Sequence, residues 1–118
     1  MRQFAAMLAD EISSWLHVSE KPMFGVRGFY RGRQIFAALP GKRAIYSANA
    51  ILLRFSNPPE RLRKRISAEE RMHAEQMGRR WFPFELSSAD DIRDALTWLG
   101  EAYESATPRS SKNKQIKK

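Results

Sequence analysis

The sequence contains no cysteine, and this absence excludes disulfide bonds, thiol nucleophiles and cysteine-ligated metal sites. It also lacks a long apolar segment. The longest run without a charged residue covers only residues 44–53, whereas a helix that crosses a bilayer needs about 20 apolar residues. Near the N-terminus, Asp10 and Glu11 interrupt the chain before a signal peptide could form. We therefore expect a cytoplasmic protein that has no membrane partner.

Residues that usually carry out catalysis are scarce as well. The two histidines, His17 and His73, are far apart in the sequence and lack the spacing of a metal site. No phosphate-binding loop and no nucleophile elbow occurs. Asp90, Asp91 and Asp94 crowd a predicted helix start, where carboxylates stabilise the helix dipole. The sequence therefore predicts a protein that is not an enzyme and that uses no metal or cofactor.

Acidic residues are missing from a long stretch of the chain, between Glu20 and Glu60. The basic residues in this interval are Lys21, Arg27, Arg31, Arg33, Lys42, Arg43 and Arg54. The whole chain carries a formal net charge of +8, so positive charge without local compensation would attract a polyanion. The alternative is that carboxylates from the helices neutralise these charges once the chain folds.

A second basic cluster consists of Arg61, Arg63, Lys64 and Arg65. Glutamates are interspersed nearby, so the alternative to phosphate contact is a solvated helix with i,i+4 ion pairs. The C-terminal residues hold five of the eight surplus positive charges and only one large aliphatic residue, Ile116. Such a segment buries too little surface to offset its ordering entropy, so we expect residues 107–118 to form a disordered basic tail.

The remaining composition suits one folded domain, since 42% of the 118 residues are hydrophobic and 11% are aromatic. Apolar residues spaced by three and four positions predict a first helix over residues 2–17. Glycines and β-branched or aromatic residues then predict a meander of four antiparallel strands. These strands are expected at residues 24–30, 33–39, 43–47 and 50–55.

The first predicted hairpin has a two-residue turn at Arg31-Gly32, which suits a type I′ turn. In this register Tyr30 lies opposite Arg33, and Phe29 lies opposite Gln34. Arg27 then lies opposite Phe36. Both faces of the hairpin contain aromatic residues, so either face can be the buried one.

The segment after the meander is predicted to be helical. Pro58 and Pro59 suit the first turn of a helix, and Leu62 and Ile66 form its apolar side. Ser67 and a glutamate three residues later have the spacing of a capping box, which predicts a second short helix over residues 68–77.

The last part of the chain predicts one strand and one helix. Residues 81–86 read as an aromatic strand, and Pro83 favours an edge position for it. Its aromatic residues suit a base-stacking platform or, alternatively, one half of the core. Ser88 and Asp91 have capping-box spacing before a regular apolar stripe that predicts a final helix ending near Ser105.

Several short motifs resemble the N-terminal domain of the TfoX/Sxy competence regulators. They are Met23-Phe24-Gly25, Gly28-Phe29-Tyr30, Gly32, Phe36-Ala37 and Ile51-Leu52-Leu53-Arg54. The segment from Trp98 to Ala106 is similar to the closing helix of that family and of the related YjbR/MmcQ-like domains. The resemblance covers about residues 21 to 106. It implies an α+β fold and a regulatory or nucleic-acid-linked role, and it supplies no catalytic residues.

We therefore expect residues 1–106 to form a single α+β domain, in which an antiparallel β-meander sheet is packed by the N-terminal and C-terminal helices. The expected function is non-enzymatic binding or regulation, with nucleic acid contacted through a basic surface. The alternative is a protein-interaction or small-ligand-binding domain whose charge serves solubility, and it predicts an apolar patch or pocket near Trp81. The residues expected to contact phosphate are Arg27, Arg31, Arg33, Lys42, Arg43, Arg61, Arg63, Lys64 and Arg65.

Overall fold

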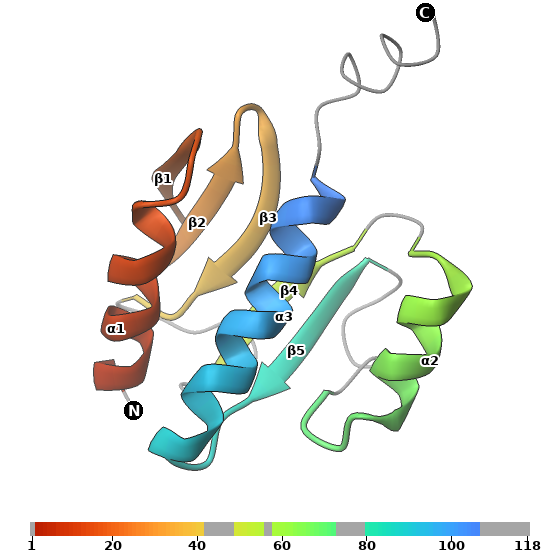
Figure 1. Ribbon diagram of the computed structural model, residues 1–118. Helices are drawn as coiled ribbons and strands as arrows, with labels where there is room; N and C mark the ends of the chain where they lie inside the picture. The colour runs from red at the N-terminus through yellow and green to blue at the C-terminus, as the bar shows by residue number, and fades with distance from the viewer. Residues whose placement is uncertain (1, 42–48, 56–57, 73–79, 107–118) are drawn as a thin grey trace, which may run out of the picture.

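The fold is an antiparallel five-stranded sheet with helices before, between and after its strands (Figure 1). A computed structural model describes residues 2–41, 49–55, 58–72 and 80–106. The strands follow the chain in the order β1-β2-β3-β4-β5. The elements are α1 (Arg2–Ser13), β1 (Val18–Met23), β2 (Val26–Arg31), β3 (Gln34–Leu39), β4 (Ala50–Arg54), α2 (Glu60–Ala68), β5 (Trp81–Glu85), the 3-10 turn η1 (Ala89–Asp91) and α3 (Ile92–Ser105).

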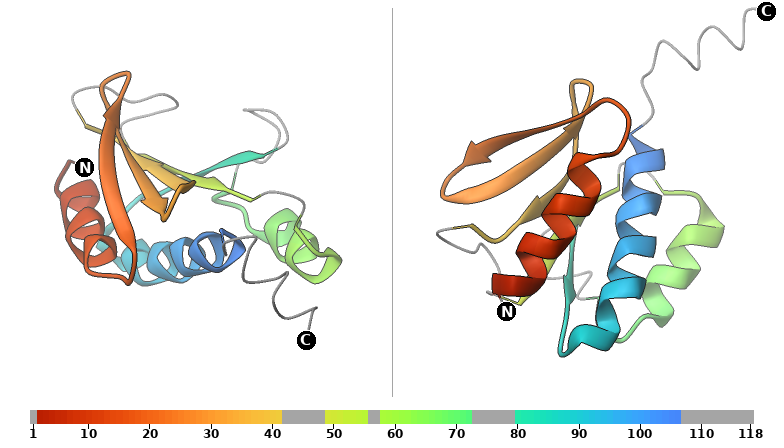
Figure 2. Two further views of the ribbon diagram at one scale, coloured as in Figure 1. Left: turned by 90° about the horizontal axis from the view of Figure 1, so that it is seen from above. Right: turned by 60° about the vertical axis from the view of Figure 1, so that its left-hand side comes forward.

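The three α-helices lie on one face of the sheet, as the view from above shows (Figure 2). We call this the helix-covered face and the opposite one the outer face. The main core lies between the sheet and the helices, where Leu8 and Ile12 of α1 and Leu99 of α3 pack with Phe29 and Leu53 of the strands. The predicted α+β fold, an antiparallel sheet packed by the first and last helices, is confirmed.

The strand β1 was not predicted. Its sequence is polar, and only its two end residues, Val18 and Met23, are half-buried. It forms an edge of the sheet, so it needs no apolar alternation and can contain Pro22. Sequence patterning detects a strand through its buried side chains, and this strand buries few.

The predicted register of the β2–β3 hairpin was wrong. The observed partners are Arg31 with Gln34 and Tyr30 with Ile35, so the turn is Gly32-Arg33 rather than Arg31-Gly32. Gly32 has φ +63°, which fits the first position of a type II′ turn. A register shift between Phe29 and Tyr30 then moves the rest of the pairing by one residue, so that Phe29 lies opposite Ala37.

The helix α1 exists as predicted but ends at Ser13, four residues before the expected boundary. The next amides of Ser14 and Trp15 bond to carbonyls three residues back, a tightening that is common at helix ends. His17 adopts φ +65°, a left-handed conformation that cannot continue the helix. Trp15 turns toward the core, and its ring stacks on Phe36 with a centroid distance of 6.5 Å.

Two further predictions concern the middle of the chain. The strand at 50–55 is confirmed as β4, whereas the strand expected at 43–47 lies outside the described residues. The separate helix expected over residues 68–77 is wrong over residues 69–72, and residues 73–77 lie outside the described residues. Ser67 lies inside α2, and Met72 instead forms a β-bridge with Phe84. Leu62 and Ile66 are buried as predicted.

The last strand and helix are confirmed. β5 is an aromatic strand that contains Pro83. It comes last in the order of the sheet formed by the described residues, so it lies at an edge as predicted. Ser88 and Asp91 form the predicted capping box, after which α3 begins at Ile92. None of the helices in the described ranges has the length and apolar character that crossing a membrane requires.

Candidate nucleic-acid interface

The residues predicted to contact phosphate fall into two groups in the fold. Arg27, Arg31 and Arg65 each form an ion pair with a carboxylate of the protein itself. Arg33, Arg61, Arg63 and Lys64 are exposed and form no ion pair with any described residue. Lys42 and Arg43 lie outside the described residues.

The hairpin arginine Arg27 is held by a carboxylate on the neighbouring strand. Its Nε and Nη2 donate to the two carboxylate oxygens of Glu20 at 2.6 and 3.0 Å. These hydrogen bonds raise the pKa of Arg27 above its ordinary value. The pair joins β1 to β2 on the helix-covered side, so most of the charge of Arg27 is already compensated.

Arg31 and Arg65 each join an element to α3. Arg31 donates from Nη1 to the carbonyl oxygen of Tyr103 at 3.0 Å, and its guanidinium lies 4.2 Å from the Tyr103 ring centroid. Arg65 donates to Glu101 at 2.9 Å, and its guanidinium lies 4.9 Å from the Trp98 ring centroid. Both side chains therefore serve the packing of the domain, and a bound polyanion would have to compete with these contacts.

The helix α2 presents the first group of cations that form no ion pair within the described ranges. Its apolar side, Leu62 and Ile66, faces the core, and the other positions point outward because an amphipathic helix buries one stripe. Arg61, Arg63 and Lys64 lie on the exposed side. We call these three residues the α2 basic face.

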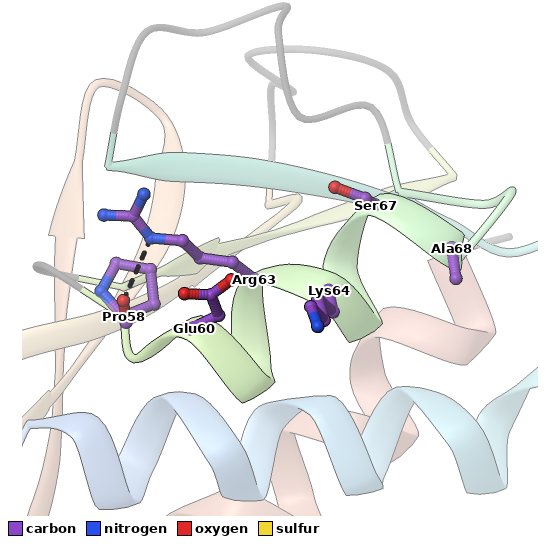
Figure 3. Close-up of a pocket in the computed structure, with 6 residues that line it drawn as sticks. All are labelled: Pro58, Glu60, Arg63, Lys64, Ser67 and Ala68. Carbon is purple, nitrogen blue, oxygen red and sulfur yellow. Dashed lines mark hydrogen bonds between the residues drawn. The ribbon is translucent and has the colours of Figure 1, made fainter.

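Beside this face lies an open depression of about 670 Å³. In the close-up, Arg63 folds back along the helix start, where its Nε donates to the carbonyl oxygen of Pro58 at 3.1 Å (Figure 3). Lys64 projects from the middle of the helix, and Glu60 is the single carboxylate among the described lining residues. The described lining is completed by Pro58, Ser67 and Ala68.

A second group of cations lies on the outer face of the sheet. All five strands contribute to a shallow groove of about 410 Å³, which includes the end of the sheet where β2 turns into β3. We call it the outer-face groove, and its described lining is Met23, Tyr30, Arg33, Gln34, Ile35, Arg54 and Trp81. Arg33 is one of the predicted site residues.

Arg54 and Trp81 were not among the predicted phosphate contacts, although Arg54 belongs to the acid-free stretch. They are direct partners in the β4–β5 pairing, so their side chains project from the same face. Phe82 and Phe84 of the same strand are buried in the core, whereas Trp81 is half-buried. The aromatic strand thus contributes to the core with some residues and to the outer face with Trp81. Only the sheet pairing, and no local pattern, brings Arg54 beside Trp81.

The other described residues that could take part in catalysis or metal binding do not form one cluster. His17 is exposed after α1, and His73 lies outside the described residues. Asp91 accepts bonds from the amides of Ser87 and Ser88 and from Arg71, which matches its predicted structural role at the helix start.

Comparison with known proteins finds no matching protein-family model, no matching curated protein and no matching solved structure. The resemblance to the TfoX/Sxy N-terminal domain therefore stays a prediction.

Proposed function

We propose that this protein is a non-enzymatic module that binds nucleic acid through its exposed cations. The observation that supports this most is the separation of the arginines into two groups. Those packed against the helices have partners inside the protein, whereas the α2 basic face and two arginines of the outer-face groove have no carboxylate partner among the described residues. Cations left uncompensated on rigid elements are the usual means of holding a phosphate backbone.

The α2 basic face suits phosphate contact for a structural reason. Packing of Leu62 and Ile66 fixes the helix, so Arg61, Arg63 and Lys64 project from a rigid support. Contacts of this kind position a nucleic acid without reading its sequence. A regulatory role, as the TfoX/Sxy resemblance implies, is compatible with such binding.

The second candidate is a small-ligand or protein-interaction domain. One observation favours it, namely that a groove lies beside Trp81. The described lining of the groove includes two arginines, so its occupant would have to be anionic. A nucleic acid meets this requirement and also explains the cations of α2.

The proposal predicts salt-dependent binding of the full chain to duplex DNA and to single-stranded oligonucleotides. The logarithm of the association constant for duplex DNA should fall with the logarithm of salt concentration by about 0.9 per phosphate contacted. Replacing Arg61, Arg63 and Lys64 together by Gln should reduce that slope by up to about 2.7, because three contacts are lost. Fluorescence anisotropy between about 50 and about 200 mM salt measures both quantities.

A matched control is available on α3. Arg93 is exposed and has no ion pair among the described residues, so Arg93→Gln changes the net charge by the same amount as Arg61→Gln. Only Arg61→Gln should reduce the slope, by about 0.9. If the full chain binds no nucleic acid at about 50 mM salt, or if both variants reduce the slope equally, binding through the α2 basic face is wrong.

A further inference from the structure

The outer-face groove combines aromatic rings with arginines that have no ion-pair partner in the described part of the chain. Tyr30 lies opposite Ile35 across the β2–β3 pair, and Arg54 lies opposite Trp81 across the β4–β5 pair. Residues directly opposite one another in antiparallel strands share a face, so these side chains extend as a row across four strands. The α-helices cover the other side of the sheet (Figure 2).

The electrostatics of the groove differ from those of the helix-covered side. Arg33 and Arg54 have no ion pair with a described residue, and the described lining includes no carboxylate. Lys21 adds a third positive charge, with its Nζ 5.2 Å from the ring centroid of Tyr30. Glu20, which precedes Lys21 in the sequence, is already bound to Arg27 on the opposite side. The groove is therefore positive, and it suits an anionic ligand.

The apolar part of the groove lies between these charges. Tyr30 and Trp81 are half-buried, so part of each ring surface remains accessible. They belong to strands that are three interstrand spacings apart, which places them roughly 14 Å from one another. Gly28 lies two residues before Tyr30 on the same strand, and a Cβ atom there would lie 3.2 Å from the carbonyl oxygen of Lys21, which is tighter than ordinary contact.

We infer that the outer-face groove binds single-stranded nucleic acid, with unpaired bases against Tyr30 and Trp81 and phosphates on Arg33 and Arg54. The inference rests on the proposed function and names its substrate class. Aromatic side chains on a basic surface bind single strands by stacking with bases that a duplex keeps within its own stack. A phosphate backbone without bases would engage the arginines alone and leave the two rings unused.

The outer-face groove and the α2 basic face are connected by a short stretch of chain. Arg54 is the last residue of β4, and Pro58 is only four residues further along the chain. The two Cα atoms can therefore be no more than about 14 Å apart. An oligonucleotide that contacts both sites would have to pass around this end of the sheet, because α2 lies on the helix-covered face (Figure 2).

The test measures binding of the full chain to three ligands of equal length: a single-stranded DNA, its RNA counterpart and an abasic DNA that keeps the phosphates. The single strands with bases should bind more tightly than the abasic one. Tyr30→Leu should weaken binding of both base-containing strands by about five- to hundredfold, because one stacking surface is lost. Binding of the abasic strand should stay within about twofold, since the change leaves every cation in place.

The fluorescence of Trp81 distinguishes direct contact with the ligand from a change in the folding of the protein. Ligand binding should quench tryptophan fluorescence, and Trp81→Phe should remove that quenching while it retains most of the affinity, because phenylalanine still stacks. Trp15 and Trp98 remain in this variant as internal references, since both pack against other side chains of the domain. Tyr30→Leu and Trp81→Phe proteins with an unchanged melting temperature provide the folding control.

Two outcomes would overturn the inference and leave the proposed function standing. In the first, the abasic and base-containing strands bind equally and Tyr30→Leu has no effect, while the α2 substitutions weaken binding of both. In the second, duplex DNA binds as tightly as the single strand. Absence of binding to every nucleic acid at about 50 mM salt would overturn both proposals together.

Discussion

Arg71 shows how one cation can join three parts of the chain. Its Nε donates to Glu69 at 2.7 Å, its Nη1 to Asp91 at 2.8 Å and its Nη2 to Asp94 at 3.0 Å. The guanidinium also lies 4.9 Å from the ring centroid of Phe84. The hydrogen bonds, that with Glu69 first, raise the pKa of Arg71 above its ordinary value. The residue thus connects the end of α2, β5 and the start of α3.

Arg71→Ala should lower the free energy of unfolding by about 2 kcal/mol, because Glu69, Asp91 and Asp94 lose their shared donor and are left close together. Urea denaturation at neutral pH measures the change. Arg93→Ala is the matched control on the first turns of α3. It should stay within about 0.5 kcal/mol, since Arg93 is exposed and has no described ion-pair partner. Equal effects of the two substitutions would contradict this role of Arg71.

The separation of the arginines into bound and unbound groups was not predictable from local sequence. Arg31 and its carbonyl acceptor at Tyr103 are 72 residues apart, and Arg65 and Glu101 are 36 apart. Arg27 and Glu20 are only seven apart, but their pairing depends on β1, which has no sequence signature. The acid-free stretch correctly located positive charge, and it could not reveal which of these charges are compensated.

The β1–β2 hairpin ends in a turn of unusual composition. Phe24 and Gly25 are its two central residues, and both have positive φ, at 51° and 86°. This is the pattern of a type I′ turn, for which Asn-Gly is strongly preferred. A bulky residue such as phenylalanine is strained in this conformation. The Phe24 side chain is also 85% exposed, so burial compensates little of the strain.

Phe24→Asn should therefore raise the free energy of unfolding by about 1 kcal/mol, because asparagine tolerates the left-handed conformation and little buried surface is lost. Gly25→Ala at the neighbouring position should have the opposite sign, with a loss of at least about 1 kcal/mol. Thermal melting of both variants measures the pair of effects. A lower melting temperature for Phe24→Asn would show that the exposed ring stabilises the hairpin by a contact.

Elements with a strong apolar period were predicted well, and elements that depend on distant partners were not. The stripes of α1, α2 and α3 and the apolar strand β4 each contain enough buried residues to define their type. The segment after α2 carries a capping-box spacing, but Met72 pairs with Phe84 and Arg71 binds carboxylates of the α3 region instead. Tertiary contacts override a local cap worth about 1 kcal/mol.

At the scale of the whole molecule, four carboxylates of the described residues lie where the helices meet one another and the sheet. Glu69, Asp91 and Asp94 surround Arg71, and Glu101 binds Arg65. Arg71 lowers the pKa of Glu69, whose ordinary value is 4.5. The amide of Ser87, and then Arg71, lower the pKa of Asp91, whose ordinary value is 3.8. These carboxyl groups are therefore harder to protonate in the folded protein than in the unfolded chain.

The free energy of unfolding should consequently fall as the pH drops below about 4.5. A carboxyl group with a depressed pKa contributes stability that is complete above its unfolded value and is lost as the pH falls through its folded value. Urea denaturation between about pH 6 and about pH 3 measures this decrease. Arg71 contributes to both depressed values, so the stability difference between the wild type and Arg71→Ala should be largest near pH 6. A difference that stays constant down to about pH 3 would contradict this linkage.

Sequence alone was sufficient for the class of the fold and for the location of the positive charge. Apolar periods of 3.6 and 2 are local, and they identify helices and strands wherever side chains are buried. Tertiary structure alone decided the register of the hairpin, the existence of β1 and the partner of each arginine. These features depend on residues that are distant in the chain, and their free energies come from pairing and packing that no local pattern encodes.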